Sequence, residues 1–181
     1  MNEKVSIILA YFDTTISNVP TADPDNIVFS VITGEQNSKG VELFAAGEIL
    51  PGWDVVGGYT YNDATITEDN VFEVGNRLNN VPEHAVSLFT SYELQQGSLQ
   101  GLGGSLGIYF VGDRAGDLDN TFEAPSYTRT DASIFYNRDK LRAALNFRNL
   151  FDIDYFENAQ NQLRVRYGAP FTVIGSVSYE F

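Results

Sequence analysis

The stretch FTVIGSVSYEF, residues 171–181, decides the fold of this chain. Every second residue from Phe171 to Phe181 is apolar, aromatic or glycine, whereas the positions between them carry threonine, isoleucine, serine, serine and glutamate. Alternation with a period of two is typical of a β-strand whose two faces meet different surroundings. The stretch therefore predicts a two-faced strand that ends on an aromatic ring.

Runs of the same kind recur along the whole chain of 181 residues, and helical periodicity is poor. We therefore expect an all-β fold with about eight strands. Although TGEQNSKG at 33–40 has the composition of a hairpin turn, we expect one long strand over 27–47. The predicted strand ranges are 4–16, 27–47, 52–63, 83–94, 101–112, 126–137, 139–149 and 169–181.

Alternation alone does not distinguish a membrane barrel from a soluble sandwich, because both present one apolar face of each strand. The lengths of the links between strands distinguish the two folds. Long and short links alternate strictly, as in membrane barrels with short periplasmic turns and long extracellular loops. No window approaches 18 consecutive apolar residues, which excludes a transmembrane helix, but a spanning strand needs only about 9 to 11 residues. The sequence thus favours an antiparallel transmembrane β-barrel. In three strands the expected apolar faces are Trp53, Val55, Gly57, Tyr59 and Tyr61, then Leu102, Leu106, Ile108 and Phe110, then Leu141, Ala143, Leu145 and Phe147.

Charge and residue content exclude several classes of function. The formal net charge of −13 argues against a nucleic-acid partner, because phosphate neutralisation needs a basic face. Cysteine is absent and histidine occurs once, so neither a thiolate metal site nor a nucleophile–base pair is indicated. The glycines of GLGGSLG, 101–107, precede no predicted helix and do not indicate a phosphate loop. We therefore expect no enzyme activity, no resident metal and no cofactor.

Four stretches resemble the C-terminal part of TonB-dependent siderophore receptors. They are VITGEQNSKGVELFAAGEILPGW (31–53), GNRLNNVPEHAVSLFTSYEL (75–94), RAALNFRNLFDIDYF (142–156) and YGAPFTVIGSVSYEF (167–181). The most specific element is NLFDIDYF, followed by a loop, YGAP and an aromatic-ended strand. The resemblance covers essentially the whole chain.

This resemblance implies an outer-membrane receptor of Gram-negative type, with a 22-stranded barrel plugged by an N-terminal domain. Such receptors bind ferric siderophores and import them with energy relayed by TonB. Residues 1–181 are expected to be a single barrel region corresponding to the last eight strands, without plug, TonB-contacting region or signal peptide, and unable to transport alone. The alternatives are a small stand-alone outer-membrane β-barrel and a soluble β-sandwich binding module.

The best binding hypothesis concerns arginines near the expected outer mouth. If apolar residues face lipid, Arg129 and Arg148 face inward, and Arg114 follows its strand at the same end, where an anionic ferric chelate would meet guanidinium groups and a tyrosine. The alternative is charge pairing with Asp131, loop acids or lipid phosphates. The candidate ligand-binding residues are Tyr109, Arg114, Arg129, Arg148 and Tyr155.

The end of the chain carries a second expectation. Strands that finish on an aromatic residue resemble the signal read by the outer-membrane barrel assembly machinery, and here Tyr179 and Phe181 would supply it. The expected partners are therefore outer-membrane lipid, the barrel assembly machinery, a ferric siderophore and, in a full-length receptor, TonB.

Overall fold

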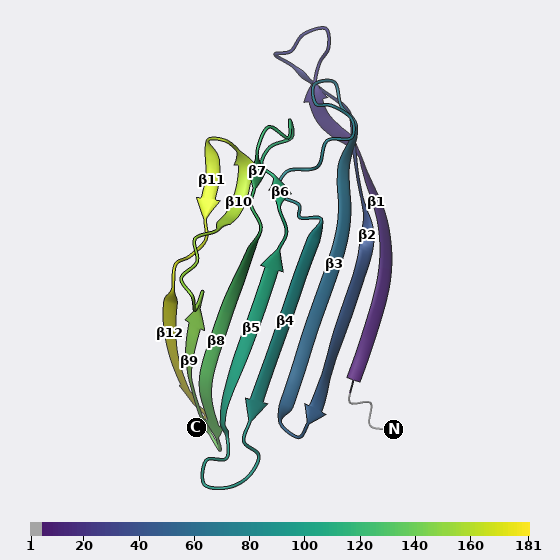
Figure 1. Cartoon of the computed structure of the whole chain (residues 1–181). Helices are drawn as coiled ribbons and strands as arrows, with labels where there is room; N and C mark the ends of the chain where they lie inside the picture. Colours follow the sequence, from purple (N-terminus) through teal and green to yellow (C-terminus); the bar gives the residue numbers. More distant parts are fainter. Residues whose placement is uncertain (1–4) are drawn as a thin grey trace.

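The computed structural model describes residues 5–181 and confirms the all-β expectation (Figure 1). Eight strands form one antiparallel sheet in the order β1-β2-β3-β4-β5-β8-β9-β12. No helix in the described part of the chain is long and apolar enough to cross a membrane. The sheet strands are β1 (Val5–Ala22), β2 (Ser30–Leu50), β3 (Trp53–Glu68), β4 (His84–Glu93), β5 (Leu102–Val111), β8 (Tyr127–Arg138), β9 (Leu141–Arg148) and β12 (Thr172–Tyr179).

Two short hairpins stand beyond the end of the sheet away from both termini, which we call the outer end (Figure 1). One pairs β6 (Arg114–Ala115) with β7 (Glu123–Ala124), and the other pairs β10 (Phe156–Asn161) with β11 (Arg164–Tyr167). The links 113–125 and 150–168, predicted as plain loops, thus contain strands of their own.

The eight predicted strands are present, and residues 33–40 lie inside β2 as expected. The predicted ends at 16 and 63 are wrong, because β1 continues to Ala22 and β3 to Glu68. Both extensions pair with β2. Glu35 of β2 is the register partner of Ser17 in β1 and of Glu68 in β3. The predicted start of the first strand at residue 4 lies outside the described residues.

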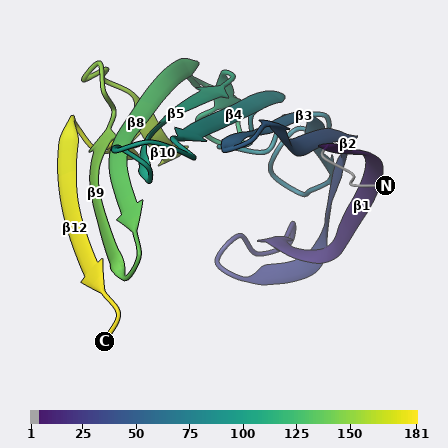
Figure 2. The same cartoon turned by 90° about the horizontal axis from the view of Figure 1, so that it is seen from below.

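The sheet is curved and open (Figure 2). Each strand pairs with its neighbours in the order given, and β1 and β12 form the two edges. Since cross-strand partners share a face, the register defines which residues lie together. One row runs through all eight strands as Val5, Gly47, Val55, Thr90, Leu106, Ala132, Phe147 and Val173.

This row belongs to a continuous apolar face, and much of it is exposed, as at Leu9, Ile134 and Val177. Its members alternate along their strands with residues of the other face. The apolar face comprises Val5, Ile7, Leu9 and Tyr11 of β1, Val41, Leu43, Ala45 and Gly47 of β2, Trp53, Val55, Gly57, Tyr59 and Tyr61 of β3, Val86, Leu88, Thr90 and Tyr92 of β4, Leu102, Gly104, Leu106, Ile108 and Phe110 of β5, Ala132, Ile134 and Tyr136 of β8, Leu141, Ala143, Leu145 and Phe147 of β9, and Val173, Gly175, Val177 and Tyr179 of β12.

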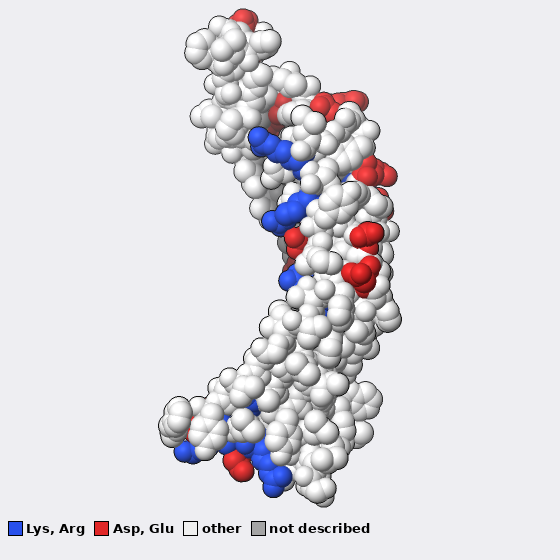
Figure 3. Space-filling view, turned by 90° about the vertical axis from the view of Figure 1, so that its left-hand side faces the viewer, with Lys and Arg blue, Asp and Glu red and all other residues white. Residues whose placement is uncertain are grey.

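Within residues 5–181, charged residues are absent from this face between the row of Tyr61 and the row of Trp53, and those of the strands at this height lie on the opposite face. On β3 the stretch from Trp53 to Tyr61 contains nine residues, which at about 3.3 Å per residue and a tilt of about 45° gives a band about 20 Å tall. Figure 3 shows the same pattern from the side of β12, with charges gathered at the two ends and a charge-free band between them. The band has the size of the apolar belt of an outer-membrane barrel.

The packed interior lies among the outer segments and not along the strands. The buried apolar residues of the described chain are Ala64, Ile66, Ala115, Ala124, Tyr155 and Ala159, all of which belong to the outer part of β3 or to the outer loops. A soluble protein would bury its large strand residues instead. The distribution is therefore that of a sheet whose apolar face meets lipid.

Candidate functional site

Three outer segments pack together into what we call the loop cluster, formed by residues 77–80, 113–124 and 149–170. The first segment runs beside the extended β3, since the amide of Leu78 donates to the carbonyl of Ala64 at 2.8 Å. The amide of Asn80 donates to the carbonyl of Ala115 at 2.8 Å, which joins the first segment to the second. The outer mouth is thus a packed structure and not a set of independent loops.

Arg114 is the centre of this cluster and is only 3% exposed. Its Nη2 donates to the carbonyl of Phe156 at 2.7 Å, and its Nη1 donates to Asn80 Oδ1 at 3.1 Å and to the carbonyl of Glu157 at 3.4 Å. The guanidinium also lies 5.7 Å from the ring centroid of Tyr127. Burial lowers the pKa of Arg114 from its ordinary value, but an arginine remains cationic over the physiological range. Arg114 therefore ties three segments together.

Arg129 lies on the inward face of β8 and is paired twice to Asp131. Its Nε and Nη2 donate to the two carboxylate oxygens, each at 3.1 Å, so the pair has bidentate geometry. The guanidinium carbon lies 4.8 Å from the ring centroid of Tyr109, the cross-strand partner of Arg129 on β5. Such a distance is within the range of a cation–π contact.

Tyr155 belongs to the third segment of the loop cluster and is buried, with only 5% of its surface exposed. Its ring lies 4.5 Å from that of Tyr127, with an angle of 36° between the planes. The amide of Gly168 donates to the carbonyl of Tyr155 at 2.8 Å, and a Cβ at position 168 would fall inside the tyrosine ring. The glycine of the YGAP stretch is thus required by the close approach of this ring.

Asn149 is fully buried, and its side chain joins the start of the third segment to residues 153 and 169 of the same segment. Its Nδ2 donates to the carbonyls of Ile153 at 2.9 Å and Ala169 at 3.1 Å, and its Oδ1 accepts from the amide of Ile153 at 3.0 Å. Its backbone has φ +52°, a left-handed conformation that asparagine tolerates better than most residues, and its amide donates to Asp131 Oδ1 at 2.9 Å. Asn149 therefore fastens the loop 150–170 to the inward face of β8.

Arg148 is the most exposed of the three candidate arginines. Its Nη2 lies 3.9 Å from Glu157 Oε1, at the long end of ion-pair distances, and its side chain is 45% exposed. Glu157 makes a closer pair with Arg166, at 3.2 Å between Oε2 and Nη2. Arg148 is consequently held only weakly by protein partners.

A cavity of about 440 Å³ opens within the loop cluster, between β7 and the β10–β11 hairpin. The rings of Phe156 and Tyr167 face each other across the hairpin with centroids 5.0 Å apart. Aromatic walls with few polar groups are typical of pockets for small ligands. The cavity is lined by Phe122, Glu123, Ala124, Phe156, Gln162, Val165 and Tyr167.

The structure brings the five candidate ligand residues into one connected region. Arg114 reaches Tyr155 through Tyr127 and reaches Arg148 through Glu157. Arg129 stacks on Tyr109 and is joined to this group through Asp131, which accepts from the amide of Asn149, the residue after Arg148. In the structure Arg129 pairs with Asp131 and Arg148 with the loop acid Glu157, which was the alternative to ligand binding. Their role towards a ligand stays a prediction.

Sequence reasoning did not find Asn149, Glu157 or the aromatic cavity. The available signal was NLFDIDYF, which contains Asn149, yet its role depends on a positive φ and on partners up to twenty residues away. At the opposite end of the sheet, Tyr179 and Phe181 form an edge-on ring pair with centroids 5.6 Å apart, and Phe181 is fully exposed. A role in barrel assembly stays a prediction too.

Comparison with known proteins agrees with this geometry. The family model described as "TonB dependent receptor-like, beta-barrel" matches residues 2–150. The chain belongs to this family. Members are β-barrel proteins of the Gram-negative outer membrane, and their named functions are those of receptors and transporters rather than enzymes.

Similar receptors cover nearly the whole chain. The metal-pseudopaline receptor CntO of Pseudomonas aeruginosa is 34% identical over 183 residues and 100% of this chain, and the ferrichrome outer membrane transporter/phage receptor of Escherichia coli K12 is 34% identical over 95% of it. Among solved structures, the siderophore receptor PiuA of Acinetobacter baumannii superposes with a TM-score of 0.84 and 27% identity, covering 99% of this chain and 26% of PiuA. The chain spans about a quarter of the length of these curated relatives, 26% of CntO and 24% of the ferrichrome transporter.

Proposed function

We propose that this chain forms part of the barrel wall of an outer-membrane receptor that imports ferric siderophores with energy supplied through TonB. The observation that supports this proposal most strongly is the continuous apolar face across eight antiparallel strands, with a charge-free band about 20 Å tall. The names of relatives support the ligand class, since they include receptors for ferrichrome, ferrioxamine B and ferric pyoverdine.

Orientation follows from the links. In outer-membrane barrels the short turns face the periplasm and the long loops face outward. The turns Pro51–Gly52 and Asp139–Lys140 lie at the end with both termini, and the loop cluster lies at the other end (Figure 1). We therefore place the termini, with Tyr179 and Phe181 as the contact for the barrel assembly machinery, on the periplasmic side, and the apolar face against outer-membrane lipid.

The loop cluster is the proposed contact for the ferric chelate. Arg129 and Arg148, with Tyr109, would meet its anionic groups from the inward face, because guanidinium groups pair well with oxyanions. Arg114 and Tyr155 are buried, so their contribution would be to fix the loops that shape the neighbouring aromatic cavity. The siderophore is the transported ligand in this proposal.

A chimaera provides the test. Residues 5–181 would replace the aligned segment of the E. coli ferrichrome transporter, which would then be expressed in a receptor-deficient strain. Heat-modifiable migration of the chimaera from the outer-membrane fraction, together with uptake of a radiolabelled ferric siderophore, is expected. A chimaera that never reaches the outer membrane would contradict the wall assignment, while one that assembles but takes up no siderophore when a panel is tried would contradict only the ligand class.

The two alternatives fit the structure less well. A β-sandwich would pack two sheets through their apolar faces, whereas residues 5–181 form one large sheet whose apolar face is uncovered. A small stand-alone barrel would pair β1 with β12, and these strands are instead the two edges of the sheet. Because an open sheet encloses no channel, the chain expressed by itself should restore no siderophore uptake.

A further inference from the structure

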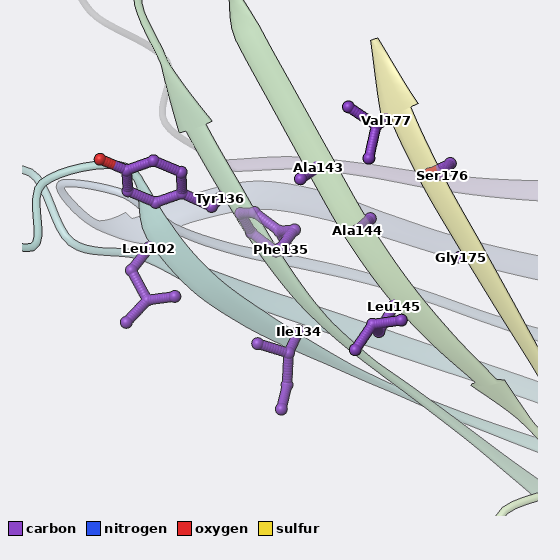
Figure 4. A pocket seen from close by; sticks show the side chains of 10 residues that line it. All are labelled: Leu102, Ile134, Phe135, Tyr136, Ala143, Ala144, Leu145, Gly175, Ser176 and Val177. Carbon is purple, nitrogen blue, oxygen red and sulfur yellow. The ribbon is translucent and has the colours of Figure 1, made fainter.

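The apolar face carries a groove of about 350 Å³ that runs across β8, β9 and β12 towards the periplasmic end (Figure 4). Two rows of the apolar face cross it, Tyr136–Ala143–Val177 and Ile134–Leu145–Gly175, and the row Phe135–Ala144–Ser176 of the other face runs between them. Ala143 lies between a tyrosine and a valine, and Gly175 lies beside a leucine, so the small residues form the floor and the larger ones the walls. The groove is almost wholly apolar.

A second depression of about 290 Å³ continues the groove at the periplasmic end and shares Tyr136 with it. It is lined by Tyr136, Arg138, Asp139, Lys140, Leu141 and Tyr179. The last residue of β8, Arg138, and the turn residue Lys140 supply the two cations. Arg138 Nη1 lies 3.4 Å from the Tyr136 hydroxyl, to which it can donate. The apolar track therefore ends at a basic and aromatic rim.

Arg138 stands on the apolar face, because it alternates with Tyr136 and pairs in register with Leu141. Within the part of the chain that the structure describes, neither Arg138 nor Lys140 has a carboxylate partner within 4.0 Å. Asp139 lies between the two cations in the sequence and lines the same depression, so the three side chains carry a net charge of +1 (two positive, one negative). The two cations make no ion pair within residues 5–181, and at a lipid interface they are complementary to phosphate. A tyrosine on either side supplies the amphipathic contact that the headgroup region favours.

We propose that these two depressions together seat one anionic phospholipid of the periplasmic leaflet, with its phosphate against Arg138 and Lys140 and an acyl chain along Ala143 and Gly175. The inference rests on the membrane orientation given under the proposed function. It concerns the outer wall of the barrel and is independent of siderophore binding, which takes place at the opposite end.

Native mass spectrometry of the full chain, released from detergent micelles doped with phosphatidylglycerol, tests the seat. The wild-type chain should retain one lipid. The double variant Arg138→Gln/Lys140→Gln should retain at least fivefold less, and diacylglycerol, which lacks the phosphate, should not be retained above background. The matched control Lys39→Gln/Arg164→Gln removes two positive charges from the outer end and should stay within twofold of wild type.

A second variant tests the acyl track without touching charge. A Cβ at Gly175 would meet only Leu145 Cδ2, at 3.6 Å, so Gly175→Leu should fill the groove while the strand keeps its pairing. Retention should fall at least threefold, with Trp53 emission and the circular dichroism spectrum unchanged. Equal retention by all variants, equal loss in the matched control, or equal retention of diacylglycerol would each overturn the seat and leave the proposed function standing. Failure of the wild-type chain to associate with phosphatidylglycerol vesicles would overturn both.

Discussion

Replacing Asn149 by alanine should release the loop 150–170 from the sheet. The side chain makes three hydrogen bonds while fully buried, two as donor and one as acceptor. At about 1 kcal/mol each these contribute about 3 kcal/mol, and holding alanine at φ +52° costs about 1 kcal/mol more than holding asparagine. The local free energy of opening should therefore fall by about 4 kcal/mol.

Hydrogen exchange of the full chain in detergent micelles measures this quantity. When opening and closing are fast, exchange follows the opening equilibrium, and each 1.4 kcal/mol is tenfold in rate. The amides of Ile153, Asp152 and Phe171, which are bonded within this segment, should exchange several hundred times faster in Asn149→Ala. Amides in the middle of β2 and β3 should be unaffected.

Two further variants sharpen the experiment. Asn146→Ala removes a neighbouring exposed asparagine whose bond to the carbonyl of Ile174 is 3.5 Å long, and should change exchange by less than threefold. Asn149→Asp preserves the shape and the acceptor oxygen but aims a carboxylate at two carbonyls, so it should open the loop at least as much as alanine does. An acceleration below tenfold in Asn149→Ala, or equal effects at positions 146 and 149, would refute the reasoning.

Three more predictions concern the outer segments. Gly168→Ala should push the ring of Tyr155 out of its buried position, because a Cβ there coincides with the ring, and hydroxyl-radical footprinting should show Tyr155 becoming reactive. Burial raises the pKa of Asp69, but hydrogen bonds from residues 71–72 and from a threonine hydroxyl lower it more, so its folded pKa lies below the ordinary 3.8. Protection of the amides at 71–72, corrected for intrinsic rates, should therefore be complete above pH 3.8 and fall as the pH drops through the lower folded value. Arg114→Gln should remove the guanidinium donor from the carbonyls of residues 156 and 157 and from Asn80 Oδ1, which keeps only the amide of Ala159, and should raise exchange in all three segments of the loop cluster together.

Each of these has a contrary outcome. Unchanged footprinting of Tyr155 would show that the ring has room that the structure does not display. The same acid dependence in Asp69→Asn would assign it to another group. Loosening of only one segment in Arg114→Gln would mean that the three are held independently.

Strand positions and faces could be predicted from the sequence because the lipid-facing side of a strand must be apolar, and Trp53 to Tyr61 and Leu141 to Phe147 carry an apolar, aromatic or glycine residue at every second position. Beyond the membrane band that constraint ends. The extensions of β1 through NVPTA and of β3 through ATITE are surrounded by water or other loops, so their pairing depends on β2 and not on an apolar period. For the same reason the two outer hairpins could not be predicted from the sequence.

The candidate site could be predicted only in outline. Strand parity placed Arg129 and Arg148 on the inward face, and the structure agrees. The partners of Arg114 could not be inferred, since they are backbone carbonyls about forty residues away, brought near by the folding of the hairpin β10–β11. A carbonyl carries no residue-specific signal in a sequence.

The ion pairs of the arginines bear directly on how a ligand would bind. A chelate that took Arg129 would have to break a bidentate pair and leave Asp131 with only the amide of Asn149, which would also loosen the loop. Taking Arg148 removes a single contact of 3.9 Å, and Glu157 would remain paired with Arg166 at 3.2 Å. Exposed ion pairs contribute little to stability, about 0 to 1 kcal/mol. Replacing the contact between Arg148 and Glu157 by a contact with the chelate therefore costs almost no free energy. Arg148 is therefore the guanidinium from which ligand binding should begin. Arg129 would follow only by giving up its pair with Asp131, while the buried Arg114 holds the loops that shape the mouth.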